Sequence, residues 1–132
     1  MTTAVVAPAK ISDFYCHQAI PGLVEIERVM ETDRVLAFHH TKPSHPVHIV
    51  VVPKEHIPSL VDLGAGGPEL LAEVMDVAAK VAAQVTEQHG AASVITNLGK
   101  YQESKHLHVH VVHRGETDEE ILAMYGHGDD EA

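Results

Sequence analysis

The segment that most constrains this chain is His-Leu-His-Val-His-Val-Val at residues 106–112. Successive side chains of a β-strand point to opposite faces, so this alternation predicts a strand with His106, His108 and His110 on one face. The apolar side chains between them would then enter a core. Imidazole is the side chain whose ordinary pKa lies nearest neutrality, which suits nucleophilic, acid–base or metal chemistry. The segment therefore predicts a strand with one core face and one reactive face.

Composition limits the classes of partner. The chain has 132 residues, 45% of them apolar, which is enough for one domain with a real core. Its 19 acidic and 9 basic residues give a net charge of −10, which disfavours nucleic acid and anionic membranes as partners. No apolar run is long enough for a transmembrane helix. The single cysteine, Cys16, excludes an internal disulfide and fits a cytoplasmic protein.

The remaining pattern predicts an α+β fold. Apolar residues recur at helical spacing over 69–88, after a Gly-Pro breaker cluster and before His89-Gly90. A capping-box pattern at Thr117–Glu120 opens a short C-terminal helix. Together these elements predict a mostly antiparallel five-stranded sheet with one long helix on one face. The predicted strands are 23–29, 35–39, 47–52, 93–96 and 106–112, within a single domain at 11–126 that a flexible leader (1–10) precedes and a polar tail (127–132) follows.

Three segments together resemble the histidine triad (HIT) family of nucleotide hydrolases and transferases. The alternating histidines followed by an apolar pair resemble the family signature. Upstream, His48–His56 resembles its His-apolar-Val-Ile-Pro-Lys-x-His strand, and Asp33–Phe38 resembles the strand that enters its nucleotide pocket. The chain is most similar to the Hint-like branch and to bacterial HIT hydrolases. The resemblance implies a HIT-like fold and a homodimer.

The resemblance also implies a role for each of four histidines. His108, the middle histidine, would attack phosphorus and form a covalent nucleotidyl intermediate that water then hydrolyses. His110 and His48 would donate hydrogen bonds to the phosphate oxygens, while His106 would orient its neighbours. Clustered imidazoles repel one another's charge, so we expect most of them to be neutral near pH 7. This chemistry requires no metal and no organic cofactor.

A nucleotide-binding set follows from the same resemblance. Asn97 and Gln102 stand at the positions of the family's Asn and Gln, and Ser104 carries a hydroxyl displaced by one position. An AMP-like nucleotide is the expected ligand. The candidates for its base and sugar pocket are Phe14, Ile20, Val24, Phe38, His40 and Thr41.

Two residues depart from the family pattern. His40 lies eight positions before His48, where the Hint-like branch has an acidic residue that binds the ribose hydroxyls. A neutral imidazole lacks that charge-assisted acceptor, so we expect weaker ribose recognition. Glu103 stands where the family's hydroxyl approaches the leaving group, and a carboxylate there would repel phosphate unless it is protonated or turned away. Lys105 would compensate only if its side chain curls into the site.

Three functions therefore stay open. The first is hydrolysis of nucleoside 5′-phosphoramidates or related phosphoanhydrides, and the second is hydrolysis of dinucleoside polyphosphates. The third is nucleotide or metal binding without significant turnover. Some bacterial HIT proteins carry a structural zinc on a Cys-x-x-Cys pair and histidines, but here Asp13 stands three positions before Cys16. Zinc on the triad itself would inhibit hydrolysis, and the sequence favours a site without a resident metal.

Overall fold

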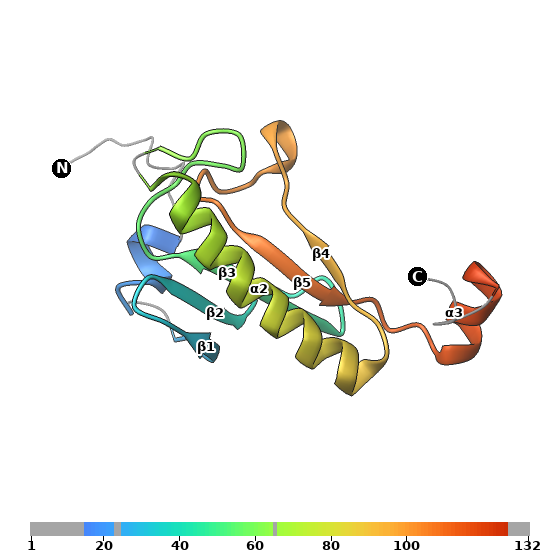
Figure 1. Cartoon of the computed structure of the whole chain (residues 1–132). Helices are drawn as coiled ribbons and strands as arrows, with labels where there is room; N and C mark the ends of the chain where they lie inside the picture. The colour runs from blue at the N-terminus through green and yellow to red at the C-terminus, as the bar shows by residue number, and fades with distance from the viewer. Residues whose placement is uncertain (1–14, 23–24, 65, 127–132) are drawn as a thin grey trace.

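The computed structural model describes residues 15–22, 25–64 and 66–126. Within them, five strands form one antiparallel sheet in the order β1-β2-β3-β5-β4, and the long helix α2 crosses one of its faces (Figure 1). The short helix α3 lies apart from the sheet, beyond the end of β5 (Figure 1). This architecture confirms the predicted α+β fold. The elements are η1 (Tyr15–Ala19), β1 (Glu27–Glu31), β2 (Val35–His39), β3 (Val47–Pro53), α2 (Gly67–His89), β4 (Ser93–Ile95), η2 (Gly99–Tyr101), β5 (Val109–His113) and α3 (Asp118–Tyr125).

One face of the sheet and one stripe of α2 make the main core. The helix begins with a proline in its first turn and ends at Gly90, whose φ of 90° is a left-handed conformation that glycine adopts without strain. Its apolar side chains recur at helical spacing and are fully buried against β2, β3 and β5. The buried cluster consists of Val35, Ala37, Ile49, Val51, Val74, Val77, Ala78, Val81, Val85, Val109 and Val111.

The opposite face of the sheet is divided between a second core and the histidines. The π-helix η1, which the sequence did not predict, packs Tyr15 and Ala19 against Phe38 and Val50 of β2 and β3. The side chains that β3 and β5 present beyond it include His48 and His110.

Two predicted strands begin elsewhere than expected, and hydrogen bonds explain both differences. β1 starts at Glu27 rather than at residue 23, because Glu27 pairs with His39, where β2 ends. The turn at Thr32, whose hydroxyl accepts the Val35 N–H at 3.0 Å, helps to set this register. β5 starts at Val109 rather than at His106. The N–H of Leu107 donates to the carbonyl of Ile57 at 2.6 Å, so this stretch pairs with a loop before the ladder begins.

The C-terminal helix has the predicted capping box. The Thr117 hydroxyl accepts the Glu120 N–H at 3.1 Å, and the Glu120 carboxylate accepts the Thr117 N–H at 2.8 Å. The predicted leader and tail lie outside the described residues. Among the residues that are described, no helix is long and apolar enough to cross a membrane.

Candidate active site

The sheet register brings two histidines together on the face that α2 leaves uncovered. His110 pairs with Val50 of β3, and His48 pairs with Val112 of β5, so the two histidines are diagonal neighbours on one face. Their rings meet through Nε2 of His48 and Nδ1 of His110, 2.8 Å apart. They line a cavity of about 1050 Å³ together with His108. The cavity is large enough for a nucleotide-sized ligand.

His108 presents a lone pair to this cavity. Its Nδ1 lies 2.7 Å from the carbonyl oxygen of His106, and a carbonyl can only accept. The hydrogen of a neutral His108 ring is therefore on Nδ1, and Nε2 keeps its lone pair. This is the arrangement that a nucleophilic imidazole requires, because the attacking nitrogen must be unprotonated.

His48 and His110 have the opposite tautomer. The backbone N–H of Ser44 donates to Nδ1 of His48 at 3.0 Å, so the hydrogen of the neutral ring is on Nε2. That Nε2–H donates to Nδ1 of His110, which places the hydrogen of His110 on its own Nε2. One backbone amide thus orients two rings, and the last of them offers an N–H donor beside the lone pair of His108.

These imidazoles are neutral at neutral pH, chiefly because they are buried. Burial, reinforced by the neighbouring imidazoles, lowers the pKa of His48 to about 4, and the same two causes lower the pKa of His110 to about 4. Burial also lowers the pKa of His108. The sequence prediction of neutral rings holds for these three residues, but desolvation rather than mutual repulsion is the larger cause.

His40 belongs to the same cluster and is a donor as well. Its ring stacks on His48 with a centroid distance of 4.4 Å, and burial lowers its pKa. The backbone N–H of Lys42 donates to Nδ1 of His40 at 3.0 Å, so a neutral His40 has its hydrogen on Nε2. The one acceptor nitrogen of a neutral His40 ring is therefore already occupied and is not available to a ribose hydroxyl.

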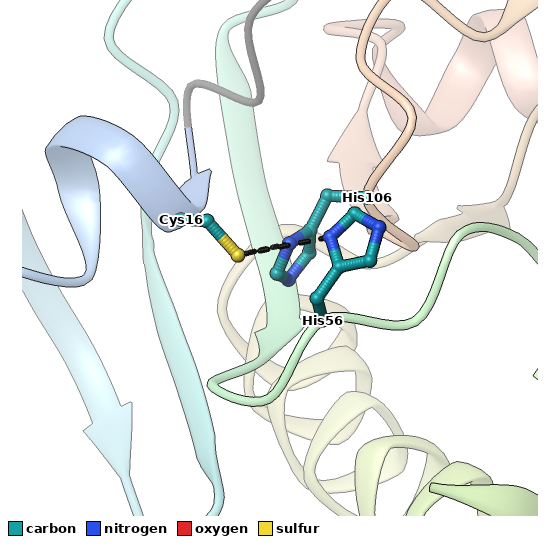
Figure 2. A group of neighbouring side chains, drawn as sticks. All are labelled: Cys16, His56 and His106. Carbon is teal, nitrogen blue, oxygen red and sulfur yellow. Dashed lines mark hydrogen bonds between the residues drawn. The ribbon is translucent and has the colours of Figure 1, made fainter. Parts of the chain in front are cut away.

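A second cluster lies behind the nucleophile and contains Cys16, His56 and His106 (Figure 2). The Sγ atom of Cys16 is 3.1 Å from Nδ1 of His106 and 3.7 Å from Nδ1 of His56. Nε2 of His106 donates to the carbonyl of Pro53 at 2.7 Å, so its Nδ1 lone pair faces the sulfur. His106 is fully buried and lies outside the cavity lining, which agrees with a framework role.

The two clusters differ in their suitability for a metal, although each holds three donor atoms within 4.8 Å of one another. The Cys16 cluster fits zinc, because a thiol and an imidazole lone pair converge and the far nitrogen of His106 donates to a carbonyl, as metal-bound histidines usually do. Zinc there would tie η1 to the loop after β3 and to the segment before β5, a structural contribution. The His40–His48–His110 cluster does not fit, because backbone amides occupy Nδ1 of His40 and of His48 and put the hydrogen on Nε2 of each ring, so neither Nε2 offers a lone pair to a metal.

The predicted nucleotide-binding residues separate into two groups. Phe38, His40, Thr41, Asn97 and Ser104 line the cavity. Gln102 does not, because its amide nitrogen donates to the carbonyl of Pro58 at 2.7 Å. Ile20 packs against the second core and also lies outside the lining. Phe14 and Val24 lie outside the described residues.

Both departures from the family pattern face the cavity. Glu103 lines it with an exposed side chain, whereas Nζ of Lys105 donates to the carbonyl of Gly99 at 3.0 Å. Lys105 therefore does not curl toward Glu103. The hydroxyl of Ser104 is buried without a hydrogen-bond partner in the described structure, which leaves it available to a ligand.

Sequence reasoning missed several lining residues. The ring of Tyr15 lies 5.0 Å from that of His108, and His45 meets His48 edge-on at 5.4 Å. Ser44 orients His48 through its backbone. A helix of five residues and a Pro-Ser-His-Pro loop carry no periodicity, so only their proximity to the His48 motif could have suggested these residues.

The family follows from a direct comparison. Residues 24–117 match the model of the HIT domain. The chain belongs to the HIT family. The family and the fold predicted from the sequence are both confirmed, and the histidine geometry above is therefore that of a HIT protein.

Curated relatives extend over most of this HIT chain. A HIT-like protein of Chlamydia pneumoniae is 31% identical over 96 residues, which cover 72% of this chain and 87% of the relative. The purine nucleoside phosphoramidase of Escherichia coli is 33% identical over 86 residues, which cover 64% of this chain and 72% of the relative.

Solved HIT structures share the fold. A histidine triad protein from Clostridium difficile is 36% identical with a TM-score of 0.62, and the match covers 71% of this chain and 84% of that one. A HIT family hydrolase from Legionella pneumophila is 28% identical with a TM-score of 0.64, covering 75% of this chain and 89% of that one.

Proposed function

We propose that this HIT protein hydrolyses nucleoside 5′-phosphoramidates or related phosphoanhydrides through a covalent nucleotidyl intermediate on His108. The hydrogen bond from Nδ1 of His108 to the His106 carbonyl carries the proposal, because it leaves the Nε2 lone pair for attack. The relation to a purine nucleoside phosphoramidase at 33% identity supports the same class of substrate.

The first step transfers the nucleotidyl group to the protein. Nε2 of His108 forms a bond to phosphorus while the bond from phosphorus to the leaving nitrogen breaks. The electron pair of that bond stays on the nitrogen, which takes a proton from solvent. The Nε2–H of His110 donates to a phosphoryl oxygen and stabilises the negative charge there.

The second step releases the nucleotide. A water oxygen attacks phosphorus, the bond to Nε2 of His108 breaks, and its electron pair returns to the ring. The proton of the attacking water goes to solvent, which balances the proton taken up in the first step. The products are a nucleoside monophosphate and a free amine.

The oligomeric state and the cellular compartment belong to the same proposal. β4 is an edge strand of the described sheet, and Val94 and Ile95 on it are 47% and 39% exposed. An exposed apolar edge favours pairing with a second copy, so we propose a homodimer joined along β4. The single cysteine fits a protein of the reducing cytoplasm.

A binding protein without turnover is the second candidate. Glu103 favours it, because a carboxylate in the cavity opposes the approach of a phosphate group. Dinucleoside polyphosphates, with their more numerous charges, would be opposed more strongly still.

Trapping the intermediate tests the proposed function. The protein is incubated with an AMP phosphoramidate, quenched, and digested under mildly basic conditions, because phosphohistidine is acid-labile. We expect nucleotidyl mass on His108, and none in the His108→Ala variant. An adduct on His106 or His110, or turnover of His108→Ala within about tenfold of the parent, would contradict the proposal.

A further inference from the structure

Glu103 is the only carboxylate among the described residues that line the cavity. Its side chain is exposed, and it makes no ion pair or hydrogen bond within the described part of the chain. The nearest lysine in the sequence, Lys105, is engaged with the carbonyl of Gly99. Lys42 also lines the cavity, but no ion pair joins it to Glu103 in the described structure, so the carboxylate of Glu103 is left unpaired there.

Glu103 lines the same cavity as His108, whose ring carries the attacking nitrogen. It favours the protonated forms of both His108 and His40, where it opposes the effect of burial on the pKa of each ring. His108 carries the attacking nitrogen, so a group that interacts with its ring also interacts with whatever is attached to the phosphorus. A negative charge here repels an anionic leaving group and attracts a cationic one.

The chemistry of the substrate determines where a compensating cation can lie. The phosphoryl group is anionic, and the nucleoside half carries no cation at neutral pH. Within the substrate, a positive charge can therefore lie only on the leaving group. Aliphatic amines are the corresponding chemical class, because an ordinary alkylamine has a pKa of about 10 and is protonated near pH 7.

We propose that Glu103 selects substrates by the charge of the leaving group, favouring leaving amines that carry a second, protonated amino group. Neutral amines come next, and carboxylate- or phosphate-bearing leaving groups come last. This inference rests on the proposed function and alters none of its bond-forming or bond-breaking steps. It adds that the freed amine departs from beside the Glu103 carboxylate.

A matched substrate series tests the inference. Three AMP phosphoramidates have leaving amines of the same length that end in an ammonium, a methyl or a carboxylate group. The parent is compared with Glu103→Gln, with Glu103→Lys, and with the control Glu119→Gln on α3, which is exposed and outside the cavity lining. The melting temperature of each variant shows whether it is folded.

We expect kcat/KM of the parent to fall about fivefold from ammonium to methyl, which corresponds to about 1 kcal/mol, and again from methyl to carboxylate. Glu119→Gln keeps this order. Glu103→Gln brings the three substrates to within about twofold of one another, and Glu103→Lys reverses the order.

The outcomes separate this inference from the proposed function. Equal kcat/KM values for the three substrates in the parent, or an unchanged order of these values in Glu103→Gln, overturn the role of Glu103. Neither result contradicts the proposed hydrolase function. If the folded parent cleaves none of the three, the proposed function and the inference fail together.

Discussion

The described residues hold two clusters of donor atoms, His40–His48–His110 and Cys16–His56–His106, and they are built in opposite ways. In the cavity cluster, the backbone N–H groups of Lys42 and Ser44 donate to Nδ1 of His40 and His48, which puts an N–H donor on Nε2 of each ring. In the Cys16 cluster, a backbone carbonyl accepts from His106, which turns a lone pair toward the sulfur. Proximity alone does not separate the two clusters. The backbone group behind each imidazole decides whether it suits an anion or a metal.

The largest expected effect separates the nucleophile from its framework. His108→Ala should lower kcat/KM by at least about a thousandfold and lower the stability less than His106→Ala does, because water that fills the cavity can donate to the freed His106 carbonyl. His106→Ala should lower the free energy of unfolding by about 2–4 kcal/mol, because it removes a fully buried ring and leaves the Pro53 carbonyl without its donor.

Single-turnover rates and urea unfolding of the two variants measure this difference. If His108→Ala loses stability and keeps activity, the roles of the two histidines are exchanged.

The second effect is the pH dependence of stability. The pKa of His48 and of His110 is about 4 in the folded protein, below the ordinary value of 6.5, so the unfolded chain binds more protons between these values. The stability from this pair is present above about pH 6.5 and is lost as the pH falls toward about 4, by on the order of 3 kcal/mol for the coupled pair.

Urea unfolding across this pH range tests the prediction. His48→Asn should flatten the dependence, and the exposed-residue control His39→Gln should preserve it. A parent whose stability rises as the pH falls from about 6.5 contradicts the assigned direction.

The third effect concerns added zinc. Zinc at about a hundred times its dissociation constant should stabilise the parent by about 2.7 kcal/mol through the Cys16 cluster. Cys16→Ser should remove this stabilisation, while His40→Gln should leave it unchanged. The melting temperature with and without zinc measures both. Loss of the zinc effect in His40→Gln rather than in Cys16→Ser would reverse our assignment of the two clusters.

The smallest effect concerns the sugar. His40 offers a donor, whereas aspartate would accept from both ribose hydroxyls with charge assistance. His40→Asp should therefore improve the preference for AMP over 2′,3′-dideoxy-AMP by about tenfold, or about 1.4 kcal/mol. Calorimetry with both nucleotides measures the ratio, and His40→Gln is the neutral control. An unchanged ratio in His40→Asp means that position 40 does not contact the ribose.

The parts of the fold that the sequence predicted are those with strong periodicity. The β-branched run at 47–52 and the apolar spacing of 69–88 each specify an element of their own, and both elements formed within two residues of the expected bounds. The start of β1 depends in part on a turn hydrogen bond at Thr32, and the start of β5 depends on a bond from Leu107 to a distant loop. Neither hydrogen bond can be predicted from the local sequence pattern.

The candidate site shows the same division. Alternation along 106–110 was enough to place His108 and His110 at one cavity, and the family resemblance added His48. The Cys16 cluster could not be predicted in this way, because its contacts join residues 40 and 90 positions apart. The contact of Gln102 with Pro58, 44 positions away, explains why a motif position turned away from the cavity.

Nitrogen NMR of the imidazole rings tests the central claim most directly, because the 15N shifts of a neutral ring report which nitrogen carries the hydrogen. At neutral pH we predict that the hydrogen is on Nδ1 in His108 and on Nε2 in His40, His48 and His110. Assignment through the Asn variant of each residue connects every signal to its ring. A neutral His108 with its hydrogen on Nε2, or a protonated His48 or His110 at that pH, would contradict the account.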